Sequence, residues 1–132
     1  MSWNITPSSE EIALLMEAGF IYRDARRFPQ ARDVFAGVRA LVPQSEVPEV
    51  ALGTVSFQQG DFEGAARHYR RALEINPRSA WAYAHLGEAC LFQADKDGAR
   101  RHLKKAVEID SRGEFGKMAR SLLEMAEAVR FQ

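Results

Sequence analysis

The sequence predicts an all-α fold, a right-handed α-solenoid built from three helix-turn-helix repeats and a closing helix. The chain matches itself at an offset of 34 residues, apolar residues recur with the period of a helix, and Gly and Pro mark the ends of the periodic segments. With 132 residues, 46% of them hydrophobic, the chain has the size and composition of one domain with an ordinary buried core. We therefore treat residues 1–132 as a single domain.

The 34-residue offset aligns residues of the same kind across three repeats, at residues 12–45, 46–79 and 80–113. Small residues at positions 8 and 20 let two antiparallel helices cross closely, and we expect the large residue at position 24 to fill the gap between repeats. Pro near the repeat end stops the second helix. At repeat positions 8, 20, 24, 27 and 32, the aligned residues are Gly19, Gly53 and Gly87; Ala31, Ala65 and Ala99; Phe35, Tyr69 and Leu103; Val38, Ala72 and Ala106; Pro43, Pro77 and Ser111.

Periodicity and stop signals predict seven helices. Ser8 and Glu11 have the spacing of a capping box at the start of the first. The repeat pattern ends after Gly113, yet apolar residues still fall on one helical stripe, which includes Met118, Leu122, Met125 and Val129. This last helix is predicted to cap the third repeat. The predicted ranges are 9–25, 28–41, 46–59, 62–75, 80–93, 96–109 and 114–130.

Residues 12–111 resemble the tetratricopeptide repeat family, which carries Gly or Ala, Ala, an aromatic residue, Ala and Pro at the five aligned positions. The resemblance implies a non-catalytic module that binds another polypeptide on its concave surface. Position 11, often aromatic in the family, departs from the pattern: it is Tyr22 in the first repeat but Ser56 and Cys90 in the others. We therefore expect looser packing or an altered tilt in the middle of the array.

Helical geometry assigns positions 2, 5, 9 and 12 of each first helix to the concave surface. This predicted groove is largely apolar and suits an amphipathic helix or an extended segment, with Phe20, Phe57 and Trp81 as the main anchors. In an alternative, the segment around Trp3 or the last helix covers part of it; apolar groups near an open end then favour a homo-oligomer. The predicted groove residues are Ala13, Met16, Phe20, Arg23, Val47, Val50, Thr54, Phe57, Trp81, Ala84, Glu88 and Leu91.

Composition favours a protein or peptide partner. Eighteen basic and eighteen acidic residues balance, so no net charge attracts nucleic acid or an anionic membrane. The chain has no apolar run of membrane-spanning length and no recognisable signal peptide, which predicts a cytoplasmic protein. His68 and His102 share a repeat position, but no third ligand with metal-site spacing accompanies them. We expect no metal, no cofactor and no enzymatic activity.

Two subtypes of the family are relevant. The carboxylate clamp that binds the acidic end of heat-shock chaperones is absent, because Met16, Phe20, Ala84 and Glu88 occupy its positions. Size, repeat number and groove character are similar to the small bacterial chaperones of type III secretion, which implies a dedicated chaperone for one partner. The alternative is a scaffold or self-assembling adaptor that also uses a basic convex stripe, suited to an acidic protein surface. The stripe comprises Arg67, Arg70, Arg71, Arg100, Arg101, Lys104 and Lys105.

Overall fold

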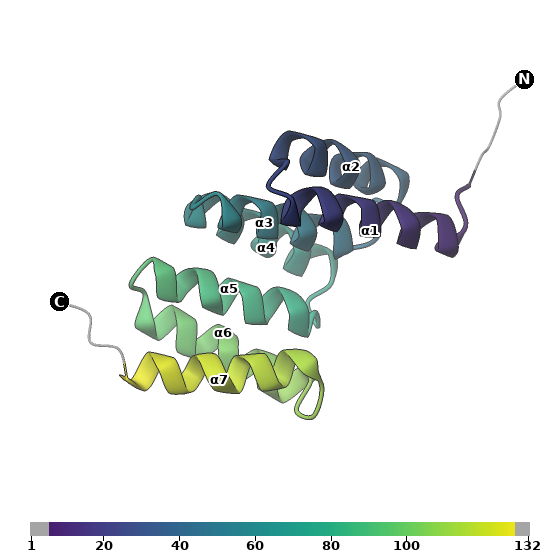
Figure 1. The fold of residues 1–132 in the computed structure, drawn as a ribbon. Coiled ribbons are helices and arrows are strands. Elements are labelled where there is room, and N and C mark those ends of the chain that lie inside the picture. The colour runs from purple at the N-terminus through teal and green to yellow at the C-terminus, as the bar shows by residue number, and fades with distance from the viewer. Residues whose placement is uncertain (1–5, 129–132) are drawn as a thin grey trace, which may run out of the picture.

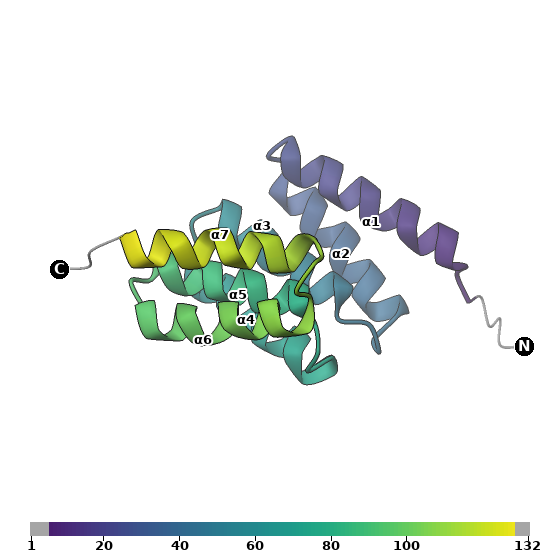
Figure 2. The same cartoon turned by 90° about the horizontal axis from the view of Figure 1, so that it is seen from below.

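The computed structural model describes residues 6–128, which form seven helices joined by short turns. Figure 1 shows the pairs α1/α2, α3/α4 and α5/α6 stacked in chain order, with α7 after the last pair. Seen from below, α1 runs at a steep angle to α7, so the stack twists along its length (Figure 2). The helices are α1 (Ser9–Asp24), α2 (Phe28–Leu41), α3 (Val47–Gln58), α4 (Phe62–Ile75), α5 (Ala80–Phe92), α6 (Lys96–Ile109) and α7 (Glu114–Ala128).

The all-α repeat fold is confirmed, and the predicted helix ends agree with the structure to within one residue. The exception is the end of α7, where predicted positions 129 and 130 lie outside the described residues. The capping box at α1 is present: the Glu11 amide donates to Ser8 Oγ, and the Ser8 amide donates to the Glu11 carboxylate, both at 3.1 Å. No helix in the described part of the chain is long and apolar enough to cross a bilayer.

The turn inside each repeat has the same backbone conformation. Arg26, Gly60 and Ala94 all have positive φ angles, of 61°, 79° and 59°, and they are spaced by the repeat period. In the second and third repeats the next residue, Asp61 or Asp95, caps the following helix by accepting a hydrogen bond at 2.9 Å from the amide three residues later. The period seen in the sequence therefore reappears in the backbone.

The aligned glycines lie at the crossing of the two helices of each repeat. Gly19 packs against the ring of Phe35, and a Cβ atom at this position would overlap that ring; Gly53 meets Tyr69 and Gly87 meets Leu103 in the same way. The residue at position 24 thus packs against the glycine of its own repeat. The sequence predicts only a contact between repeats for this position. Tyr69 has both contacts, because its ring also stacks on His85 with the centroids 5.6 Å apart.

Buried side chains in the described chain gather in two clusters. The first repeat and α3 share one, which contains Phe35, Leu52 and Val55. A second, larger cluster joins α4, α5, α6 and α7. In α7, Ala119, Leu122 and Ala126 are buried, as expected of a cap, but Met125, predicted to lie on the same buried stripe, is exposed.

Candidate functional site

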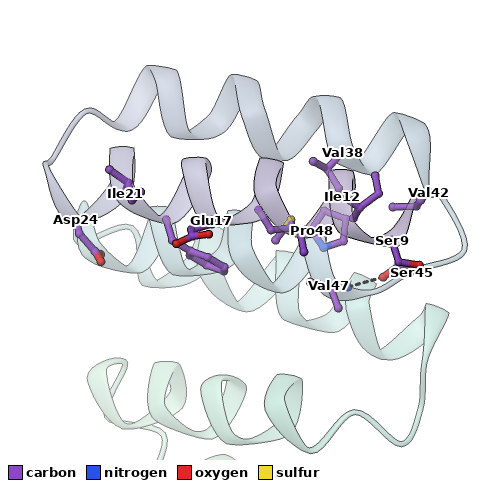
Figure 3. A pocket seen from close by; sticks show the side chains of 13 residues that line it. Ser9, Ile12, Glu17, Ile21, Asp24, Val38, Val42, Ser45, Val47 and Pro48 are labelled. Carbon is purple, nitrogen blue, oxygen red and sulfur yellow. Dashed lines mark hydrogen bonds between the residues drawn. The ribbon is translucent and has the colours of Figure 1, made fainter. Parts of the chain in front are cut away.

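An open apolar pocket of about 520 Å³ lies beside α1, between the end of α2 and the start of α3. Figure 3 shows its side chains distributed along α1, from Asp24 and Ile21 at one end to Ile12 and Ser9 at the other. We call it the apolar pocket. It is lined by Ser9, Ile12, Ala13, Met16, Glu17, Phe20, Ile21, Asp24, Val38, Val42, Ser45, Val47 and Pro48.

A second pocket, of about 300 Å³, lies where the first helices of all three repeats converge. Four of its side chains carry a charge or a titratable ring or hydroxyl, so we call it the polar pocket. It is lined by Arg23 from α1, Thr54, Phe57 and Gln58 from α3, Tyr69 from α4, and His85 and Glu88 from α5.

Arg23 connects the two pockets. Its guanidinium lies over the Phe20 ring of the apolar pocket, 4.8 Å from the centroid. On the other side its Nη1 atom donates to Thr54 Oγ1 at 2.9 Å, and its Nε atom donates to Asp24 at 2.9 Å. Arg23 therefore contacts both Phe20 of the apolar pocket and Thr54 of the polar pocket. We call the two pockets together the groove.

Tyr69 contributes to the wall of the polar pocket. The Tyr69 side chain is fully buried, and its hydroxyl has no hydrogen-bond partner among the described residues. Burial raises the pKa of this hydroxyl, Glu88 raises it further and Arg23 opposes that effect. The hydroxyl is therefore protonated at neutral pH and is available as a hydrogen-bond donor.

Eight of the twelve predicted groove residues line these pockets. Val50 and Ala84, both at repeat position 5, do not: they are 0% exposed and belong to the core. Adjacent first helices pack over them, so they offer no surface to a partner. Arg23 and Glu88, the two charged members of the predicted groove, both line the polar pocket. The eight that line the groove are Ala13, Met16, Phe20 and Val47 in the apolar pocket, and Arg23, Thr54, Phe57 and Glu88 in the polar pocket.

Two of the three predicted anchors pack against other aromatic side chains. Trp81 stacks on Phe115 of α7 with the centroids 5.9 Å apart, so the last helix covers one side of it, as in the alternative arrangement. The Phe57 ring packs against the rings of Phe62 and Phe92, with centroid distances of 5.0 and 4.9 Å. Leu91 is half-buried against the core. The other proposed cover, the segment around Trp3, lies outside the described residues.

Sequence reasoning missed several residues of the groove, among them Ile12, Ile21, Tyr69 and His85. Tyr69 was assigned to packing because it aligns with Phe35 and Leu103. The available signal was its hydroxyl, since it is the polar member of that aligned set. Ile12 and Ile21 were missed because α1 leaves more of its surface open than the other first helices do.

The remaining candidates have structural partners. His68 Nδ1 lies 2.9 Å from Oε2 of the buried Glu49. The other carboxylate oxygen of Glu49 accepts a hydrogen bond from Arg39 Nη1 at 3.1 Å. His102 stacks on Tyr83, with centroids 6.2 Å apart. In residues 6–128, no group of three His, Cys, Asp or Glu side chains is placed to hold a metal ion.

The convex basic stripe is partly neutralised by acidic neighbours. Arg100 forms a two-bond ion pair with Glu127 of α7, at 2.8 and 3.0 Å. Arg67 pairs with Glu63 at 3.4 Å, and Lys105 pairs with Glu108 at 3.7 Å. Surface pairs of this kind contribute little to stability but reduce the local positive potential.

The second and third repeats match two family models, one described as TPR repeat over residues 53–91 and one as Tetratricopeptide repeat over residues 82–112. A search of curated proteins found no significant match.

Three solved structures illustrate the fold. The TPR domain of Sgt2 from Aspergillus fumigatus has a TM-score of 0.82 at 20% identity, over 97% of this chain and 83% of that one. The Yersinia enterocolitica type III secretion chaperone SycD, in complex with a peptide of the translocator YopD, has a TM-score of 0.77 at 19% identity, over 92% and 95%. The first TPR of Spaghetti (RPAP3), bound to the HSP90 peptide SRMEEVD, has a TM-score of 0.78 at 18% identity, over 95% and 97%.

These likenesses extend the repeat geometry beyond the matched residues. The family models fall on the second and third repeats, and the structural alignments run through the first helix pair as well. The same turn conformation and the same glycine contact occur in all three helix pairs. Residues 53–112 therefore match the tetratricopeptide repeat family, and the described chain as a whole has the all-α repeat fold of these solved structures.

Proposed function

We propose that this protein is a non-catalytic chaperone that holds an apolar segment of one partner polypeptide in its groove. The carrying observation is the open apolar pocket along α1, where Ile21 is 62% exposed beside Phe20 and Met16. Exposed apolar side chains around a pocket of this size are a typical anchor site for a peptide side chain. The cytoplasm is the compartment we expect for this activity.

Related folds support a peptide ligand. SycD and RPAP3 have this fold and are found in complex with peptides. An acidic peptide of the HSP90 type fits poorly, because Met16 and Ala84, at two of the clamp positions, are buried. Phe20 and Glu88, at the other two, present a ring and a negative charge. An apolar segment of the kind that a secretion chaperone shields is therefore the better ligand.

The test uses Ile21→Glu, because this side chain lines the pocket and is mostly exposed. Phe20 is a poorer choice, because its ring packs on the core residue Phe35 with the centroids 5.0 Å apart, so a substitution there would also change stability. The Glu variant should keep its unfolding free energy within about 0.5 kcal/mol and lose roughly tenfold or more in client affinity. Clients are captured from the source cell with the wild-type chain, identified by mass spectrometry and titrated with both proteins.

The matched control is Leu14→Glu, which places the same charge on another exposed position of α1. It should leave client binding unchanged. A chaperone yields one client in a complex of fixed stoichiometry. The proposal fails if Ile21→Glu retains full affinity for the client, or if wild-type protein recruits several unrelated proteins at once.

A second surface favours the adaptor or self-assembly alternative. Leu14, Leu15 and Leu41 are exposed together with Pro7 around a depression of about 450 Å³ on the first repeat. If this surface joins two copies, light scattering of the purified chain shows a dimer that Leu14→Glu converts to monomer while Ile21→Glu does not. A concentration-independent monomer removes the self-assembly alternative.

A further inference from the structure

The Tyr69 hydroxyl makes no hydrogen bond to the described residues. Phe35 and Leu103 occupy the equivalent position in the other repeats and contact their glycines without a hydroxyl. The ring of Tyr69 makes the same contact with Gly53, so a Phe at this position would fill the same space. The hydroxyl is nevertheless buried, without a partner among the described residues, in the wall of the polar pocket. Buried hydroxyls without a partner are uncommon, and this one is placed to meet a ligand in the pocket.

The neighbouring polar groups show which ligand the hydroxyl would meet. Thr54 already donates to the Ala51 carbonyl oxygen at 2.6 Å and accepts from Arg23. Arg23 uses Nε and Nη1 for Asp24 and Thr54, so much of its charge is already compensated. Glu88 lies on the opposite helix, 3.4 Å from His85 Nδ1. The pocket therefore offers a donor, Tyr69, and an acceptor, Glu88.

The charges disfavour an ionic ligand. A carboxylate would meet the negative Glu88 and an arginine whose charge Asp24 already compensates. An ammonium group has no lone pair to accept a hydrogen bond from the Tyr69 hydroxyl. A neutral group with one acceptor and one donor avoids the repulsion by Glu88 and satisfies both sides of the pocket.

We propose that the polar pocket binds an amide group of the held segment, with the amide oxygen accepting from the Tyr69 hydroxyl and the amide N–H donating to the Glu88 carboxylate. The amide is either a main-chain peptide group or an Asn or Gln side chain. This inference rests on the proposed function, because the ligand is the segment held in the groove. Arg23 lies between the two pockets, so an apolar anchor in one and an amide in the other fix the register of the segment.

The test uses dodecapeptides selected from a random display library on the immobilised chain, with counter-selection against the Ile21→Glu variant so that they bind in the groove. Tyr69→Phe should weaken their binding by roughly five- to tenfold, the usual effect of one hydrogen bond. Its melting temperature should equal or exceed that of the wild type. Tyr83→Phe is the matched control, since Tyr83 lies outside both pockets, and it should leave affinity unchanged.

Glu88→Gln separates an amide ligand from an anionic one. For an amide ligand the variant binds more weakly, because a charged acceptor is lost. Tighter binding identifies a carboxylate ligand and overturns the inference. Unchanged affinity of Tyr69→Phe overturns it too, as does a lowered melting temperature, which would show that the hydroxyl has a partner inside the fold.

Peptide analogues distinguish the two sources of the amide. Ester replacement of single peptide bonds removes one main-chain N–H, and Ala replacement removes an Asn or Gln side chain. One of the two replacements should make the wild type and Tyr69→Phe bind the peptide with equal affinity, and that replacement identifies the bound amide. If neither replacement removes the difference in affinity, the inference is overturned. If the library yields no peptide sensitive to Ile21→Glu, the proposed function itself fails. If peptides are sensitive to Ile21→Glu but not to Tyr69→Phe, only the inference fails.

Discussion

At Gly53 the missing side chain determines how closely α3 and α4 approach. A Cβ atom there would overlap the Tyr69 ring, which is fully buried and has no room to move away. Gly53→Leu should therefore lower the unfolding free energy by about 1–3 kcal/mol in urea titrations. Gly37 is the control, because nothing lies within 4 Å of its Cβ position, and Gly37→Ala should be neutral or slightly stabilising. Equal melting of Gly53→Leu and wild type would contradict the predicted register.

His102 makes stability depend on pH. Burial lowers the pKa of its imidazole below the ordinary value of 6.5, and the neighbouring Arg101 and Arg70 lower it further. The unfolded chain therefore binds a proton at a higher pH than the folded chain does. The contribution of this group is fully present above pH 6.5 and is lost as the pH falls through 6.5 towards the folded pKa.

We expect His102→Gln to reduce the loss of stability between neutral pH and mildly acidic pH. Denaturant titrations of the wild type and of His102→Gln, each at neutral and at mildly acidic pH, measure the change in unfolding free energy with pH. Subtracting the change in the variant from that in the wild type cancels the contribution of the other titrating groups. A wild-type protein and His102→Gln variant with parallel pH profiles would show that this histidine is not responsible.

At the scale of elements, the turn between α5 and α6 adopts an unfavourable backbone conformation. Ala94 has a φ of 59°, whereas the equivalent turn of the second repeat has Gly60 at 79°. A left-handed conformation costs a non-glycine residue about 1 kcal/mol. Ala94→Gly should raise the unfolding free energy by about that amount. Ala89→Gly, inside α5, is the control and should lower it, so a uniform loss in both variants would refute the strain argument.

The last helix, α7, is predicted to be required for a soluble fold. Its buried residues Ala119, Leu122 and Ala126 cover the apolar side of α5 and α6, and Arg100 of α6 forms its ion pair with Glu127. Deleting residues 114–132 should expose this core and cause aggregation or loss of cooperative unfolding, measured by gel filtration and circular dichroism. A truncated chain that stays monomeric and equally stable would contradict the capping role.

At the scale of the whole molecule, the two core clusters predict that unfolding begins at the first repeat. Its cluster is smaller, and α1 leaves Leu14 and Ile21 exposed. Cys90, in the larger cluster, is 2% exposed, and burial raises the pKa of its thiol, so a thiol reagent reaches it only after the second cluster opens. In urea, part of the helical signal should be lost before Cys90 reacts. Coincident transitions would indicate one cooperative unit instead.

The repeat, the seven helices and the cap were predicted from the sequence because their signals act over short distances. Pro, Gly and capping residues fix where a helix starts and stops, and the spacing of Gly19, Gly53 and Gly87 determines where the paired helices cross. Helical geometry also indicated which face of each first helix looks into the groove. Met125 shows the limit of helical geometry as a predictor of burial. It lies on the apolar stripe of α7 but is exposed.

The sequence by itself therefore determined the fold and the register of the repeats. Only the tertiary structure decided which side chains on the predicted face stay open. Val50 and Ala84 are closed off, Trp81 is covered on one side by Phe115, and Tyr69 lines a polar pocket formed by three repeats. The physical reason is that a residue's position on its helix gives a direction, whereas its exposure depends on the angle and distance at which the neighbouring repeat packs.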